Sequence, residues 1–131
     1  MRTLVVLVLG LAFVAGCGED DEPAGPVDAG PALADLTVTV DADGEGGRAA
    51  ETRTVQCDEG DESPECRAVA KLTPAVFEPT PRGTACTQQF GGPEKATVTG
   101  TFQGRRVDAT FSRANGCEIA RWKNAAALLG R

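Results

Sequence analysis

The chain has 131 residues and a net charge of −6, so it is long enough for one small domain. The negative charge argues against a nucleic-acid partner, because proteins that bind nucleic acid usually carry a basic patch. The chain has no histidine and no tyrosine, and aromatic residues make up 5% of it. A core with so few large side chains is thin, and we expect covalent cross-links to support it.

The first 16 residues have the pattern of a bacterial lipoprotein signal peptide. Arg2 supplies a positive charge, and the apolar run from Leu4 to Val14 is too short to span a bilayer comfortably. The motif Val14-Ala15-Gly16-Cys17 resembles a lipobox, whose cysteine is acylated and becomes the first mature residue. We therefore expect an extracellular protein that acylated Cys17 anchors in the outer face of the bacterial cytoplasmic membrane. An ordinary secretory signal is the alternative, and it also exports the chain.

Residues 17–34 are predicted to form a disordered tether. The segment contains the acidic run from Glu19 to Glu22, is rich in proline and glycine and has almost no large apolar residue. It cannot bury enough surface to fold by itself. The acidic run could be read as a calcium site, but a solvated linker is the simpler interpretation. The folded domain is expected to span residues 35–131.

Apolar and polar residues alternate at the start of this domain and predict a β-hairpin. The segment Leu36–Val40 has the period of two that is typical of a half-buried strand. Glu51–Cys57 is predicted as the second strand, and Asp43–Gly47 as the turn between them. Ser63 and Pro64 are typical of a helix start, and that helix is expected to end at about residue 72.

The second half of the domain is predicted to contain further strands. They are Ala96–Phe102, Arg105–Phe111 and Cys117–Trp122, with a short helical turn over residues 123–129. Gly104 and Gly116 are expected to adopt the positive φ that tight hairpins require. Residues 73–83, which are rich in proline, are expected to form an extended connection before these strands.

Four cysteines remain once Cys17 is assigned to lipid: Cys57, Cys66, Cys86 and Cys117. An even number of cysteines in an exported chain predicts two disulfides, for which three connectivities exist. We favour the connectivity in which the first cysteine pairs with the second and the third with the fourth, because each pair then closes a local loop. A four-cysteine zinc site is the alternative, but the spacing contains no C-x-x-C pair.

The residues needed for common kinds of catalysis are missing. Without histidine the chain has no Ser-His-Asp or Cys-His nucleophile system. Paired cysteines leave no reactive thiolate. The carboxylates cluster in the tether and in the loop of residues 58–62, and no phosphate-binding glycine loop is recognisable. We therefore expect a binding protein that is not an enzyme and that uses no cofactor and no metal.

The most informative pattern lies between Cys86 and Glu118. It contains Val98-Thr99-Gly100, then Phe102-Gln103-Gly104-Arg105-Arg106-Val107, and finally Asn115 before Cys117-Glu118. Together with Pro93 and the order of the four cysteines, this pattern resembles the Streptomyces subtilisin inhibitor family. The resemblance covers the chain from about Leu36 to its C-terminal residue and is dense only in this segment.

The resemblance implies an α+β fold with a five-stranded antiparallel sheet, two short helices on one face and two disulfides. It also implies the disulfide connectivity favoured above and a homodimer formed through the sheet. Members of this family inhibit subtilisin-like serine proteases by presenting an exposed loop as a substrate. The resemblance therefore implies that the partner of this chain is a subtilisin-like serine protease.

The reactive loop implied by the resemblance comprises Thr87, Gln88, Gln89 and Phe90. Cys86 anchors this loop, and Gln88–Gln89 is the scissile bond. Gln88 stands where the family generally has a large apolar or basic residue, and Thr87 stands where proline is typical. Gly91-Gly92 lengthens the loop by one residue. The alternative function is a non-inhibitory, lipid-anchored module on the same fold that binds a cell-surface partner.

Overall fold

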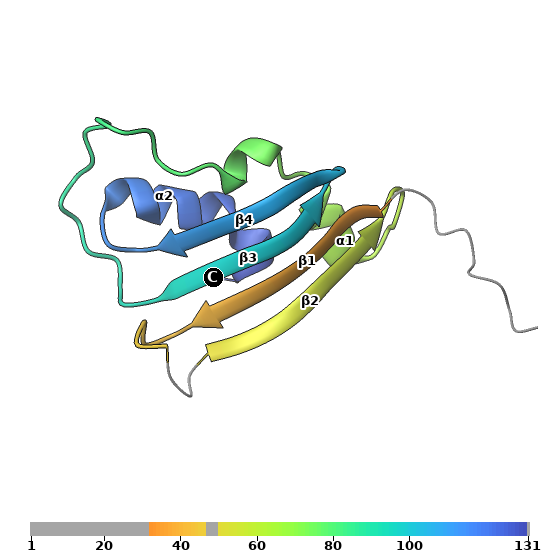
Figure 1. Ribbon diagram of the computed structural model, residues 1–131, viewed down its shortest axis with the longest axis horizontal. Coiled ribbons are helices and arrows are strands. Elements are labelled where there is room, and N and C mark those ends of the chain that lie inside the picture. The colour runs from red at the N-terminus through yellow and green to blue at the C-terminus, as the bar shows by residue number, and fades with distance from the viewer. Residues whose placement is uncertain (1–31, 47–49, 131) are drawn as a thin grey trace, which may run out of the picture.

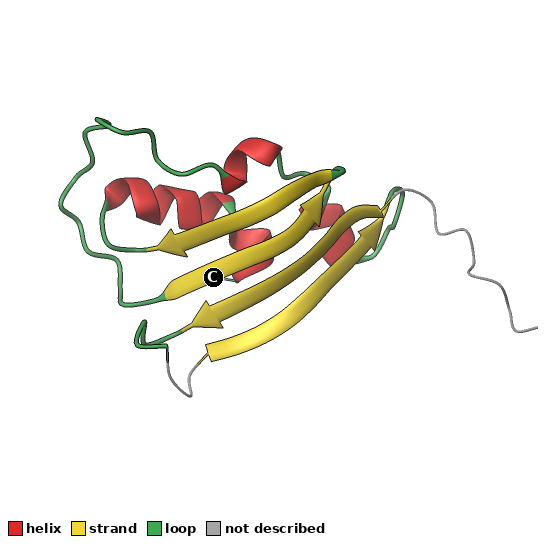
Figure 2. Ribbon diagram, viewed as in Figure 1, coloured by secondary structure: helices red, strands yellow, loops and turns green. Residues whose placement is uncertain are grey.

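The computed structural model of the chain describes residues 32–46 and 50–130, which form one antiparallel sheet with helices on one of its faces (Figures 1 and 2). In chain order the elements are β1 (Ala32–Asp41), β2 (Ala50–Asp58), α1 (Pro64–Val69), the 3-10 helix η1 (Pro74–Phe77), β3 (Lys95–Phe102), β4 (Arg105–Ser112), α2 (Gly116–Asn124) and α3 (Ala126–Leu129). The predicted signal peptide, the predicted acylation site Cys17 and residues 17–31 of the predicted tether lie outside the described residues.

The fold is α+β in class, and its sheet has the strand order β2-β1-β3-β4. In the central strand β1, the alternation that predicted a strand buries Leu36 and Val38 completely on one face. Thr37 points to the other face and is paired with Thr54 of β2 and Thr99 of β3. The strand begins at Ala32, three residues before the predicted domain boundary, so residues 32–34 belong to the sheet and not to the tether.

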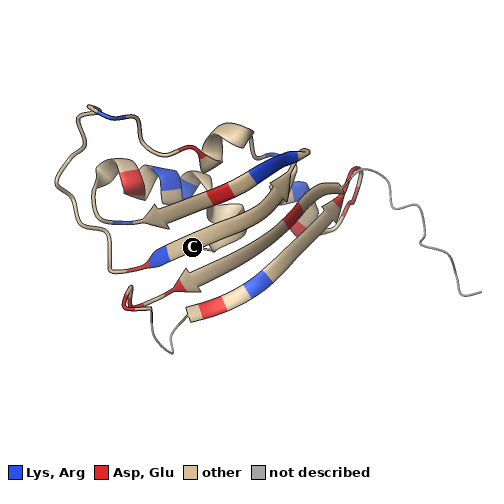
Figure 3. Cartoon of the chain, viewed as in Figure 1, with Lys and Arg blue, Asp and Glu red and all other residues tan. Residues whose placement is uncertain are grey.

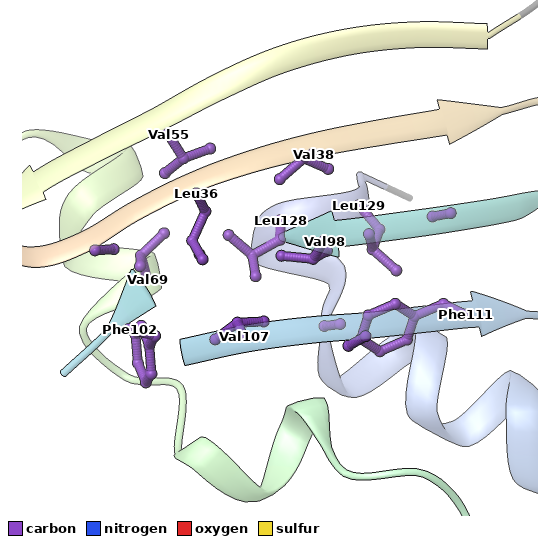
Figure 4. Packing of buried hydrophobic residues seen from close by; sticks show 14 of the residues in the cluster. Leu36, Val38, Val55, Val69, Val98, Phe102, Val107, Phe111, Leu128 and Leu129 are labelled. Carbon is purple, nitrogen blue, oxygen red and sulfur yellow. The ribbon is translucent and has the colours of Figure 1, made fainter. Parts of the chain in front are cut away.

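The core lies between the sheet and the helices (Figure 4). Its largest fully buried side chains are Phe102, Leu36, Leu128, Val38, Val55, Val69 and Val98. They come from β1, β2, β3, α1 and α3, so both the sheet and the helices contribute side chains to the core. Among residues 32–46 and 50–130, no helix has the length and apolar character that crossing a membrane requires.

The hairpin between β3 and β4 confirms the turn predicted at Gln103-Gly104. Gln103 has a φ of 49° and Gly104 a φ of 72°, and positive values at both central residues are typical of a type I′ turn. The backbone N–H of Gln103 also donates to the carbonyl oxygen of Leu33 at 2.8 Å. This contact joins the turn to the first residues of β1.

The strand predicted over Cys117–Trp122 is wrong, because these residues lie in helix α2. Asn115 caps this helix, and its Oδ1 accepts a hydrogen bond from the backbone N–H of Glu118 at 3.0 Å. Trp122 is buried, and Ala125, one helical turn later, is buried with it. Gly116 begins the helix and is not among the glycines with positive φ, contrary to the turn predicted there.

Within the described residues the sheet therefore has four strands, and the predicted fifth strand is not confirmed. The helices number three, since α1, α2 and α3 replace the two that were expected, and η1 adds a single turn. The helix predicted at Ser63 does begin there, and Ser63 Oγ accepts from the backbone N–H of Cys66 at 3.2 Å. It ends at Val69 rather than at residue 72.

Both disulfides have the favoured connectivity. Cys57 of β2 is bonded to Cys66 of α1, with their Cα atoms 5.5 Å apart. Cys86 is bonded to Cys117 in the first turn of α2, with their Cα atoms 5.4 Å apart. The first bond fixes α1 to an edge strand. The second fixes the long connection between η1 and β3 to the beginning of α2.

Candidate functional site

The candidate site is the loop of residues 84–94, which follows the extended connection after η1 and leads into β3. Figure 1 shows this connection passing around the N-terminal end of α2 at the left of the molecule. The disulfide from Cys86 to Cys117 joins the two segments there. No regular secondary structure forms between Thr84 and Glu94, so tertiary contacts must hold the loop in place.

Two backbone hydrogen bonds fix the loop to the segment that leads into α2. The N–H of Gly116 donates to the carbonyl oxygen of Thr87 at 3.0 Å, and the N–H of Gly91 donates to the carbonyl oxygen of Arg113 at 2.8 Å. Residues 88–90 lie between these two fixed points. Their side chains are exposed, and no hydrogen bond within the described part of the chain uses their backbone or side-chain atoms.

Close packing supports these two hydrogen bonds. A Cβ atom added at Gly116 would lie 2.0 Å from Oγ1 of Thr87, and one added at Gly91 would lie 2.8 Å from Cδ1 of Ile119. A side chain at either position would therefore force the side chain of Thr87 or Ile119 to move, because the loop runs directly against α2. Gly91 is therefore a point of close contact between the loop and the Ile119 side chain of α2.

An ion pair fixes the end of the loop before β3 begins. Arg113 Nη1 lies 2.7 Å from Oε1 of Glu94, and both side chains are about one-third exposed. Gly92, with a φ of 143°, passes next to this carboxylate, and a Cβ atom there would collide with Glu94 Oε2. The positive φ therefore favours glycine at residue 92, because other residues rarely adopt this backbone conformation.

A polar network fixes the connection that precedes the loop. Glu118 accepts a hydrogen bond from Thr80 Oγ1 at 2.8 Å and forms an ion pair with Arg121 Nη1 at 2.7 Å. Arg121 also donates to the carbonyl oxygens of Glu78 at 2.9 Å and Thr110 at 3.2 Å. Helix α2 thereby holds the connection against strand β4. This network was not predicted, although Asn115 followed three residues later by Glu118 matches a capping-box pattern.

The exposed part of the loop is uncharged and carries one large apolar side chain. Residues 83–93 include no Asp, Glu, Lys or Arg. Figure 3 correspondingly shows a long stretch of the connection before β3 without charged colouring. Phe90 is 69% exposed and is the one exposed large hydrophobic residue in the described part of the chain. The predicted loop residues are thus placed together on the surface beside the predicted anchor, Cys86.

A second polar surface is the face of the sheet opposite the core. Eight threonines from all four strands dominate it, and all but Thr101 have another threonine as a register partner: Thr37, Thr39, Thr52, Thr54, Thr97, Thr99, Thr101 and Thr110. Thr39 Oγ1 lies 2.8 Å from Thr52 Oγ1. We call this surface the threonine face.

Among the described residues, the one carboxyl group with a shifted pKa lies away from the loop. Asp41, at the end of β1, accepts hydrogen bonds from the backbone N–H of Gly46 at 2.6 Å and of Gly44 at 3.1 Å. The Gly46 hydrogen bond is the main reason that the pKa of Asp41 falls below its ordinary value of 3.8. These contacts cap the strand and order the turn that follows, so the role of Asp41 is structural.

Among residues 32–46 and 50–130, no group of three or more His, Cys, Asp or Glu side chains is placed to hold a metal ion. The four cysteines of the alternative zinc site are instead paired in disulfides. Comparison with known protein families finds no family model that matches the chain. None of the curated proteins is significantly similar to it.

Proposed function

We propose that the chain is an exported, lipid-anchored inhibitor of subtilisin-like serine proteases, with Gln88–Gln89 as its reactive bond. The observation that carries this proposal is that residues 88–90 are exposed between two fixed points of the backbone. Backbone hydrogen bonds to Arg113 and to Gly116 at the start of α2 fix the residues on either side of them. The disulfide from Cys86 to Cys117 lies close by in the chain. The resemblance of residues 86–118 to the subtilisin inhibitor family supports the same function.

The backbone of the loop suits recognition as a substrate. Thr87 to Gly91 are absent from the residues with positive φ, so the negative φ that an extended strand needs is present throughout. The backbone groups of residues 88–90 make no hydrogen bond within the described chain and are free to pair with a protease as an added strand. A loop that is already ordered loses little conformational entropy when it binds.

The contacts that hold the loop also explain how a cleaved loop would stay inhibitory. After cleavage, the disulfide from Cys86 retains the acyl side, and the hydrogen bond from Gly91 to Arg113 retains the amine side. The new amine of Gln89 therefore stays close to the acyl carbon of Gln88. Proximity of this kind strongly favours re-formation of the bond over release of the product.

The alternative is a non-inhibitory module on the same fold that binds a cell-surface partner or assembles through its sheet. The threonine face favours this reading, because helices do not cover it and its side chains are regularly paired. Gln88 favours it as well, since a glutamine amide buried without matched partners in a protease pocket is costly. A homodimer through the threonine face is compatible with either function.

Titration of the mature chain against a panel of subtilisin-like proteases tests the proposal. We expect at least one tight complex in which the chain is cut slowly, and only between Gln88 and Gln89. Rapid proteolysis of the loop, or no effect on any protease of the panel, would contradict inhibition and favour the non-inhibitory module. Mass spectrometry of the complex identifies the bond that is cut.

A further inference from the structure

Phe90 is an exception among the phenylalanines that the structure describes. Phe102 and Phe111 are buried, and Phe77 packs against the core with its ring centroid 5.3 Å from that of Phe102. Phe90 alone leaves most of its surface in water, at 69% exposure. A ring of this size that stays exposed contributes none of the folding free energy that its burial would provide. Aromatic side chains, phenylalanine among them, are also enriched in the cores of protein interfaces relative to the rest of the protein surface.

The backbone at Phe90 is fixed by its next neighbour. Gly91 donates to Arg113 at 2.8 Å and lies against the side chain of Ile119 so closely that a Cβ atom there would not fit. The ring of Phe90 is therefore presented from an ordered backbone. A partner that buries this ring gains its apolar surface without first having to order the chain.

Phe90 and Gln88 differ in what they offer a partner. A buried phenylalanine ring contributes about ten- to a hundredfold in affinity. A glutamine amide gains affinity only where the partner satisfies its hydrogen bonds. Phe90 is the second residue on the amine side of Gln88–Gln89, and on that side it also remains attached to the new amine after cleavage.

We propose that Phe90, rather than Gln88, is the main anchor of the loop, and that the target protease has an apolar pocket on the leaving-group side of the scissile bond. This inference rests on the proposed inhibitory function. Burial of Phe90 in that pocket holds the amine of Gln89 against the acyl-enzyme. The anchor thereby affects both the affinity of the inhibitor and its resistance to cleavage.

The test compares the mature chain with Phe90→Ala, Phe90→Leu and Gln88→Ala, using the protease of the panel that the unchanged chain inhibits most tightly. For each protein the inhibition constant and the rate of cleavage between Gln88 and Gln89 are measured. We expect Phe90→Ala to weaken inhibition by about ten- to a hundredfold and to accelerate cleavage. Phe90→Leu should keep most of the affinity, and Gln88→Ala should cost less than Phe90→Ala.

Thermal unfolding provides the control, since an exposed ring can be removed without lowering the melting temperature. A larger loss for Gln88→Ala than for Phe90→Ala, or unchanged cleavage of Phe90→Ala, would overturn the anchor while leaving inhibition intact. Failure of the unchanged chain to inhibit any protease would instead refute the proposed function, and the anchor with it. The two failures are therefore distinguished by the unchanged chain alone.

Discussion

The backbone N–H of Gly116 donates to the carbonyl oxygen of Thr87 at 3.0 Å, and no room remains for a side chain between these two residues. Helix α2 and the candidate loop therefore meet closely, with the side chain of Thr87 lying against the backbone of Gly116. Cys86 and Cys117, the sequence neighbours of Thr87 and Gly116, are joined by a disulfide directly beside this contact. The position of the loop consequently depends on the small size of residue 116.

Gly116→Ala should displace the loop, because the new Cβ atom would lie 2.0 Å from Oγ1 of Thr87. We expect the free energy of unfolding to fall by about 1–3 kcal/mol and inhibition to weaken, as for other overpacked sites. Denaturant unfolding and the inhibition constant measure the two effects. The double change Thr87→Ala with Gly116→Ala removes the closest atom and should recover part of the stability. Strict additivity of the two changes would argue against this contact.

The two disulfides should differ in what their removal does to the loop. Replacing both Cys86 and Cys117 by serine should lower stability by about 2–5 kcal/mol and turn the chain into a readily cleaved substrate. Replacing Cys57 and Cys66 should lower stability similarly but leave cleavage between Gln88 and Gln89 slow. Proteolysis at a temperature where both variants are folded separates the two effects. Equal cleavage of the two variants would show that the disulfide at Cys86 has no special role.

Gln88→Met should increase affinity for subtilisin, by roughly tenfold or more, because an apolar side chain replaces an amide that needs partners. Residue 88 is exposed, so the melting temperature should not change. Inhibition assays at matched concentrations measure the gain, and Gln88→Asn, which keeps the amide, is the matched control. A non-inhibitory module should show no gain with either variant.

Asp41 should make the chain more stable at neutral than at acid pH. Hydrogen bonds, mainly from Gly46, hold the pKa of Asp41 in the folded state below its ordinary value of 3.8. The stabilisation is therefore complete above this ordinary value and is lost as the pH falls through the lower folded pKa. Denaturation between about pH 5 and pH 2 should show this loss, and Asp41→Asn should be less stable at neutral pH and less sensitive to acid. An unchanged pH profile in Asp41→Asn would contradict the assignment.

Cys17→Ala should release the protein from the membrane, since residue 17 is the predicted acylation site. We expect incorporation of a labelled fatty acid into the unchanged chain and none into the variant. Fractionation of the producing cells should then find the variant outside the membrane fraction. Retention of the variant by the membrane would show that the chain is held in another way.

The strands could be predicted because apolar and polar residues alternate along their sequences. The prediction of Leu36–Val40 fell inside β1, and that of Ala96–Phe102 matched β3 to within a residue. The segment Cys117–Trp122 was misassigned because its apolar residues fit both a period of two and a helical period. The cap formed by Asn115 and Glu118 decides between them, and the sequence showed that pattern.

The candidate site could be predicted only in part. Counting cysteines and weighing the local loops gave the correct disulfides, and the position of Cys86 marked the exposed loop. The hydrogen bond from Gly116 to Thr87 could not be foreseen, because residues so far apart in the chain meet only once α2 has docked. The contacts of Arg121 with Glu78 and Thr110 depend on the same docking.

Strand β1 enters the sheet at the end of the molecule opposite the candidate loop, as Figure 1 shows. A strand of ten residues extends about 33 Å, so the point of entry and the loop are separated by most of the length of the molecule. If Cys17 is acylated as proposed, the lipid would be attached on the N-terminal side of Ala32, where the described chain enters the sheet. Phe90 would then lie at the end of the domain that is remote from the anchored residue, which is where the proposed inhibitor needs it.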